Sequence, residues 1–231
     1  MKGVRLTRNR IGYHSILGLF ICIFLIFFTN LYLRPFKSPS SETYFINPTA
    51  NLEYFTFGYR ELVADILWLR AIQDLDQCER KLGPDEECTR SWVYRMTDKV
   101  TDLSPKFRII YATVPLLLAI GIKDTVGAIE LLDKGLKYYP NDWPILYRGG
   151  YLYLFEKGDR IKAAEYFIRA QKNGAPPWLA SFATRLYTEA GRWAMAEQLI
   201  KEYESTGLSE ALLNRMRNQL EKAVKKSDKS Q

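Results

Sequence analysis

Two carboxylates and two guanidinium groups lie close together in one stretch of the chain and are the first candidates for chemistry. Glu61 and Asp65 are four residues apart, so on a helix they would share one face. Paired carboxylates can act as a general acid and a general base. Arg60 and Arg70 flank them, and structural ion pairing is the ordinary role of such a group. His14 is the only histidine of the chain, so no imidazole lies near them in sequence.

The sequence lacks the motifs of well-known enzyme classes. It contains no nucleophile elbow, no Walker loop, no HExxH zinc motif and no glycine fingerprint for a dinucleotide. Acid–base chemistry would fall to carboxylates without a recognisable partner. We therefore expect a protein that is not an enzyme and that uses no cofactor.

The cysteines indicate a disulfide rather than a metal site. Cys78 and Cys88 bracket a polar segment with a Gly-Pro turn, and in an oxidising compartment they could close a short loop. The alternative is two unrelated thiols. No metal site is expected, because thiols ten residues apart lack CxxC spacing and the single histidine lies far away in sequence. Cys22 lies in an apolar stretch, where it is expected to fill space.

The net charge of +7 is concentrated at the N-terminus. Residues 1–37 contain six basic side chains and no acidic one, whereas the remainder holds 27 basic and 26 acidic side chains. A nucleic-acid-binding protein needs its excess cations on the folded surface, where they displace counterions from phosphates. We therefore expect no nucleic-acid partner.

An apolar stretch follows the basic N-terminus. Ile11 to Leu33 is 23 residues without formal charge, and as a helix it would be about 34 Å long, enough for a hydrocarbon core of about 30 Å. A cleaved signal peptide is the main alternative, but bulky residues stand where a small-x-small cleavage site would be. A buried core helix is a weaker alternative, because no polar stripe interrupts the run. The sequence predicts a transmembrane anchor over residues 11–34.

The charges on either side of this stretch predict an orientation. Four cations precede it and two follow it, so the positive-inside bias puts residues 1–10 in the cytoplasm and the rest on the opposite side. In a bacterium this describes a single-pass protein of the inner membrane with a periplasmic domain. The membrane contact would be made by residues 11–34.

The rest of the chain is predicted to be all-α. Residues 35–57 are expected to form a linker and an irregular segment, and residues 58–224 a solenoid of helical hairpins that ends in a capping helix. Residues 225–231 are polar and are expected to be disordered. In the first helix Leu62, Ile66 and Leu69 recur every three or four residues as one apolar face. The later helices are expected at 91–103, 107–121, 125–139, 142–157, 159–172, 177–190, 193–203 and 209–224.

A pattern of small residues repeats along this region. Gly158 and Ala163 are followed 33 residues later by Gly191 and Ala196, and Ala128 precedes Ala163 by 35 residues. An alanine at these positions lets two helices approach closely. Each glycine permits a tight turn with positive φ. Such a period is typical of arrays of helix pairs.

On these residues the chain resembles the tetratricopeptide repeat (TPR) family, a family of protein-binding helical solenoids. Gly158 to Ala170 looks like the family's turn and second helix, and Gly191 to Tyr203 matches except for its final tyrosine. The resemblance covers residues 107–206, and residues 58–105 match weakly. It implies a concave face formed by the first helix of each pair.

By that resemblance, the candidate partner-binding residues lie on two helices of this face. They are Tyr147, Arg148, Tyr151, Phe155, Trp178, Arg185 and Glu189. Aromatic and arginine side chains dominate the energetics of protein interfaces, which suits an extended peptide. The alternative is that Tyr147, Tyr151 and Phe155 belong to the core, since they recur at i, i+4 spacing.

The sequence thus predicts a membrane-anchored TPR scaffold that binds partner proteins at the periplasmic face of the inner membrane and supports assembly of an envelope complex. A periplasmic chaperone or translocon-accessory protein is one alternative. An accessory subunit of a membrane enzyme complex is another.

Overall fold

The computed structural model of this chain describes residues 8–33, 48–49, 51–73 and 88–228. Every regular element within these ranges is helical, which confirms the all-α prediction. The chain divides into two units, Met1–Ile46 and Asn47–Gln231. The segment between Gln73 and Cys88, which contains the predicted disulfide partner Cys78, lies outside the described residues.

The first unit contains helix α1 (Arg8–Leu33). Within the described part of the chain, no helix combines the length and the apolar character needed to cross a membrane. The predicted transmembrane anchor at residues 11–34 is therefore wrong, and so is the single-pass inner-membrane location with a periplasmic domain.

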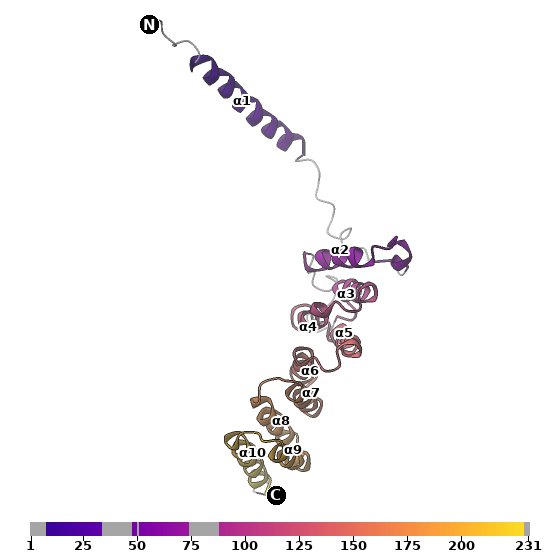
Figure 1. Cartoon of the computed structure of the whole chain (residues 1–231), viewed down its shortest axis with the longest axis vertical. Coiled ribbons are helices and arrows are strands. Elements are labelled where there is room, and N and C mark those ends of the chain that lie inside the picture. The colour runs from indigo at the N-terminus through magenta and orange to yellow at the C-terminus, as the bar shows by residue number, and fades with distance from the viewer. Residues whose placement is uncertain (1–7, 34–47, 50, 74–87, 229–231) are drawn as a thin grey trace. The chain divides into compact units, whose positions relative to one another are not determined.

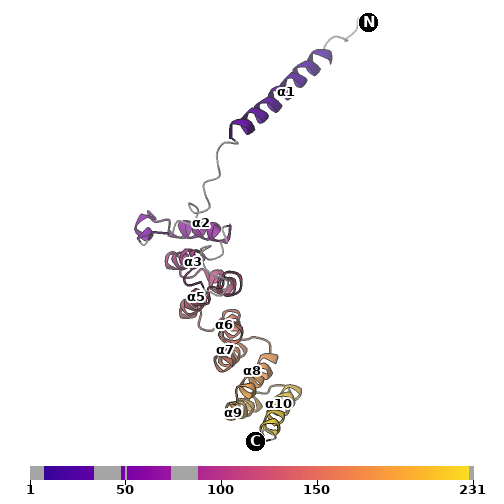
Figure 2. The same cartoon turned by 180° about the vertical axis from the view of Figure 1, so that it is seen from behind.

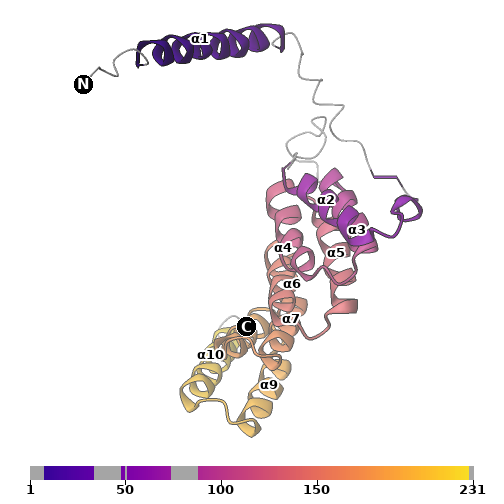
Figure 3. The same ribbon diagram turned by 45° about the horizontal axis from the view of Figure 1, so that its top comes forward.

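The second unit is a stack of helices in chain order (Figure 1). Its elements are a 3-10 helix η2 (Leu52–Phe55), α2 (Arg60–Gln73), α3 (Trp92–Leu103), α4 (Arg108–Leu116), a π-helix η3 (Leu117–Ile122), α5 (Thr125–Tyr138), α6 (Trp143–Phe155), α7 (Arg160–Lys172), α8 (Trp178–Glu189), α9 (Trp193–Ser205) and α10 (Glu210–Asp228). The main contacts join helices one or two places apart in this order, as the reverse view also shows (Figure 2). This is a repeat-like α-solenoid, with α2 and α3 at one end and α9 and α10 at the other (Figure 3).

Side chains just before the helices fix where several of them begin. Asp124, Asp142 and Asp159 each accept a hydrogen bond from the backbone N–H three residues later, at the starts of α5, α6 and α7. Ser91 does the same at the start of α3. These caps satisfy N–H groups that have no partner in the first helical turn.

The repeated small residues lie where two helices meet. Ala128, Ala163 and Ala196 are all fully buried. Gly158 and Gly191 have φ of 66° and 69° in the turns before α7 and α9, which confirms the prediction of positive φ at these two glycines. The sequence period therefore corresponds to a repeated packing arrangement.

Two elements differ from expectation. Pro115 lies inside the helix expected at 107–121 and has no N–H to donate to the regular hydrogen-bond ladder. Two residues after it, at Leu117, the winding changes from α to π. Helix α10 extends to Asp228, beyond the expected end at 224. An i,i+4 ion pair of Lys225 with Glu221 supports this last turn, and Lys225 and Lys226 also suit the negative end of the helix dipole.

Candidate partner-binding surfaces

The predicted binding residues of α6 have different environments. Tyr147 is half-buried, and its ring centroid lies 5.6 Å from that of Phe167 in α7, so it belongs largely to the core. Arg148 is also half-buried and donates from Nη1 to the carbonyl oxygen of Pro144, 3.0 Å away. Phe155 is 62% exposed, and its ring stands 4.5 Å from that of Tyr151. Of these four residues, the exposed ring of Phe155 is the one best placed to meet a partner.

The predicted residues of α8 are all accessible. Trp178 is 46% exposed, and the side chains of Arg185 and Glu189 are about half exposed. Arg185 lies over the ring of Phe182 at 4.8 Å, with its Nε 3.4 Å from a carboxylate oxygen of Glu189. Glu189 also lies 3.6 Å from Arg160 of α7. Exposed ion pairs of this kind are weak, so a ligand carboxylate can compete with Glu189 for Arg185.

A groove of about 230 Å³ lies along α8 and α10. Its lining residues are Trp178, Ser181, Phe182, Arg185, Arg215 and Gln219. The two helices begin 32 residues apart in the chain, and they pack directly on each other. Two of the predicted residues, Trp178 and Arg185, are thus brought together in one concave site.

Two polar side chains of this groove have no partner among the residues that the structure describes. The side-chain oxygen Oε1 of Gln219 is buried and accepts no hydrogen bond from any of them. Arg215 is exposed and forms no ion pair or hydrogen bond with any residue that the structure describes. Sequence reasoning missed both residues, although their i,i+4 spacing on α10 puts them on one helix face.

An apolar face of α2 is the second accessible surface. Leu62, Ile66 and Leu69 are 52 to 56% exposed, and Tyr59 just before the helix is 68% exposed. The opposite face of α2, which contains the fully buried Ala64, packs on α3. The three residues form the one apolar face that their periodicity predicts, and this face is exposed.

The carboxylates of α2 do not form an enclosed site. Glu61 and Asp65 are both exposed. The two arginines reach towards α3: Arg60 donates from Nη2 to the carbonyl oxygen of Asp102 at 3.3 Å, and the guanidinium of Arg70 lies 5.8 Å from the ring centroid of Trp92. These two contacts join α2 to α3 and do not involve the carboxylates of Glu61 and Asp65.

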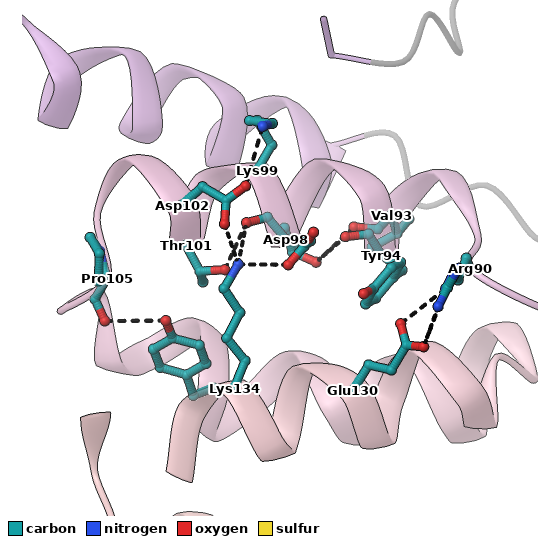
Figure 4. Close-up of polar contacts among 12 residues, drawn as sticks. Arg90, Val93, Tyr94, Asp98, Lys99, Thr101, Asp102, Pro105, Glu130 and Lys134 are labelled. Carbon is teal, nitrogen blue, oxygen red and sulfur yellow. Dashed lines mark hydrogen bonds and ion pairs between the residues drawn. The ribbon is translucent and has the colours of Figure 1, made fainter. Parts of the chain in front are cut away.

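A polar network joins α3 to α5 (Figure 4). The Nζ of Lys134 lies 2.6 Å from Oδ1 of Asp98 and 2.6 Å from Oδ1 of Asp102, one turn further along α3. At the other end of the interface, Arg90 donates from Nε and Nη2 to the carboxylate of Glu130. Each carboxylate of the network thus has a cation beside it.

The pKa shifts in this network follow from its ion pairs. Hydrogen bonds from Arg90 and Tyr94 lower the pKa of Glu130. Burial acts to raise the pKa of Asp102, but the hydrogen bonds and charges of Lys134 and Lys99 outweigh it, and the net pKa is lowered. Both carboxylates are therefore held in the charged form, which suits structural ion pairing rather than proton transfer.

A buried carboxylate organises the turn before α3. Asp124 is fully buried and accepts hydrogen bonds from the backbone N–H groups of Arg90 at 3.1 Å and Ser91 at 2.6 Å. These bonds hold Arg90 at φ 52°, in the left-handed region. Asp124 therefore caps its own helix and fixes the entry to α3 at the same time.

The two described cysteines are in different states. Cys88 is buried and disulfide-bonded, and Cys22 in α1 is a free, exposed thiol. The pairing of Cys88 with Cys78 stays a prediction, because Cys78 lies outside the described residues. Among the residues that the structure describes, no three His, Cys, Asp or Glu side chains are grouped so as to hold a metal ion.

Comparisons with known proteins add no relative. No protein-family model, no curated protein and no solved structure matches this chain.

Proposed function

We propose that this chain is a helical-repeat scaffold that holds partner proteins on the exposed surfaces of its solenoid. The observation that carries the proposal is the apolar face of α2, where Leu62, Ile66 and Leu69 stand more than half exposed. Contiguous apolar surface on a folded protein commonly marks an interaction site, because covering it with a partner removes it from water.

The architecture supports the same function. Solenoids of helix pairs present long surfaces, and their repeating contacts keep those surfaces rigid. We further propose that the pairs α6–α7 and α8–α9 are TPR-like units. The small residues at a period of 33 to 35 and the left-handed glycines Gly158 and Gly191 support that assignment.

A crosslinking experiment tests the scaffold. The full-length chain is crosslinked briefly in cells and purified, and the captured proteins are quantified by mass spectrometry. We expect one or two partners at near-equal amounts. In Ile66→Glu the new charge on the apolar face should remove at least one of them. Ala194→Glu is the matched control, since it adds the same side chain at an exposed position of α9.

The alternatives give different results. A broad set of captured proteins at low occupancy would favour a chaperone that holds many clients briefly. A partner set that Ile66→Glu and Ala194→Glu leave equally intact would contradict the role of the α2 face.

A further inference from the structure

We propose that the groove between α8 and α10 binds an extended peptide segment in which an acidic side chain lies next to an apolar one. The inference rests on the proposed scaffold function and names the chemistry of one of its partners. The acidic side chain of the peptide pairs with Arg185 and Arg215, and the apolar side chain of the peptide packs on Trp178. Three features of the groove support this ligand.

The first reason is the charge of the groove. Its lining residues include two arginines and no acidic residue, and Glu189, which pairs with Arg185, also lies beside Arg160. Arg215 has no partner among the described residues. A guanidinium offers several donors in a fixed plane, so a carboxylate can accept two hydrogen bonds from it. An acidic ligand would complete this set of charges.

The second reason is the exposed aromatic surface beside these cations. Trp178 is 46% exposed, and its ring meets Phe182 edge-on with centroids 6.2 Å apart. Phe182 in turn packs edge-on against Phe167 of the core, at 5.2 Å. Because these ring contacts already hold Trp178 in place, the indole loses little conformational entropy when an apolar side chain of the ligand packs on it.

The third reason is the unpartnered oxygen of Gln219. A buried acceptor without a donor costs free energy, and a ligand that supplies the donor recovers it. The backbone N–H groups of an extended peptide are such donors. A metal or other small cation would bind this oxygen poorly, because the two guanidinium groups of the groove repel positive charge.

Nucleic acid is a poorer fit for the same groove. Its binding depends on many phosphate contacts along an extended basic surface. Residues 38–231 carry 27 basic and 26 acidic side chains, so no such excess extends beyond the groove. Two arginines beside one tryptophan suit a single carboxylate with an apolar neighbour.

The test uses two synthetic peptide libraries and the full-length chain. Both consist of N-acetylated, C-amidated heptapeptides with six randomised positions; one has Asp at the centre and the other has Asn. Peptides retained by the protein are identified by mass spectrometry, and dissociation constants of the best ones are measured by fluorescence polarisation. We expect the Asp library to be enriched for an apolar residue next to the acid, and the Asn form of the best peptide to bind about tenfold or more weakly.

Variants locate the site. Arg215→Gln should weaken the best peptide about tenfold or more, and Trp178→Ala should weaken it and remove the preference for the apolar neighbour. Arg217→Gln is the matched control, because Arg217 is also on α10 but pairs with Glu204 and Glu210. It should leave binding unchanged, and circular dichroism should show the same helix content in all variants.

Several outcomes would overturn the inference. These are equal retention of the Asp and Asn libraries, equal loss of affinity in Arg215→Gln and Arg217→Gln, or displacement of the peptide by a stoichiometric oligothymidylate. If no peptide is selected while the crosslinking experiment still yields partners that depend on Ile66, this inference alone is wrong. If both experiments fail, the scaffold function fails with it.

Discussion

Gly150 of α6 lies directly under the ring of Phe167 in α7. A Cβ added to Gly150 would be 2.6 Å from the ring atom Cε1 of Phe167, closer than side-chain carbons approach in folded proteins. The two helices can be this close because Gly150 carries no side chain. Phe167 also packs against Tyr147 and Phe182, so its ring has little room to move away.

We therefore expect Gly150→Ala to destabilise the protein. At a helical glycine with free space around it, substitution by alanine raises the free energy of unfolding by up to about 1 kcal/mol. A decrease in the free energy of unfolding of Gly150→Ala would therefore be caused by the contact with Phe167. Overpacking of a core costs about 1–3 kcal/mol. Urea denaturation followed by circular dichroism measures the change. Gln198→Ala, at an exposed position of α9, should alter stability by less than about 0.5 kcal/mol.

The ion pairs of Lys134 give a second prediction. Lys134→Met keeps most of the apolar stem but leaves Asp98 and Asp102 one turn apart without the cation that joins them. Hydrogen bonds to charged groups contribute about 1.5–3 kcal/mol, and the partial exposure of the carboxylates reduces this, so we expect a loss of about 1–2 kcal/mol. Lys201→Met is the matched control, because Lys201 is exposed and pairs within its own helix. An equal, small effect in both variants would mean that the α3–α5 ion pairs add no stability.

The same carboxylates predict a pH dependence of stability. The pKa values of Asp102 and Glu130 are lowered in the folded protein, so the unfolded chain binds protons more tightly at these two groups. Their contribution to stability is complete above the unfolded pKa values of about 4 and is lost as the pH falls through the folded values. Urea midpoints measured between pH 6 and pH 3 should fall with pH. The fall should be smaller in Lys134→Met, and a parallel fall in both proteins would contradict this origin.

The cysteines predict a pattern of chemical labelling. In the denatured, unreduced protein a thiol reagent should modify Cys22 and leave Cys88 unmodified, because Cys22 is free and Cys88 is disulfide-bonded. Cys88→Ser should cost about 2–3 kcal/mol, the range expected for a short disulfide loop, whereas Cys22→Ser should cost little. Mass spectrometry of the unreduced digest identifies the partner of Cys88. Modification of Cys88 without reductant would exclude the disulfide.

The two faces of α2 should respond differently to substitution. Ile66→Gln replaces an exposed apolar side chain, so we expect a change in stability of less than about 0.5 kcal/mol. Ala64→Leu adds volume to the fully buried face against α3 and should cost about 1–3 kcal/mol. Thermal unfolding of the two variants measures both effects. A large loss in Ile66→Gln would show that the exposed face is needed for folding rather than for binding.

Short-range patterns predicted much of the fold. The acids Asp142 and Asp159 lie just before helices and cap them, and Gly158 and Gly191 adopt the positive φ that their turns require. These features depend on a few neighbouring residues, so the sequence contains the information needed to place them.

Features that depend on distant contacts were harder to predict. Helix α2 has apolar residues on two opposite faces, and periodicity alone cannot tell which face packs on α3; the face with the small Ala64 does, because it permits the closer approach. The groove was missed because Arg215 and Gln219 come from α10 and Trp178 from α8, and its shape depends on how these two helices pack. The ends of α1 lie within three residues of the predicted segment 11–34, but no described helix has the length and apolar character needed to cross a membrane, so the predicted anchor was wrong.

The contacts between successive helices also have a consequence for how the protein is made. During translation at about 5–20 residues per second, a pair such as α6–α7 is completed within a few seconds. Its main contacts are to helices already synthesised or to the next ones to emerge, so packing need not wait for the end of the chain. The exception is α8, whose groove is completed by α10, a helix that is synthesised only after α9. A nascent chain that has not yet released α10 would thus contain most of the described solenoid but lack one wall of the groove on α8.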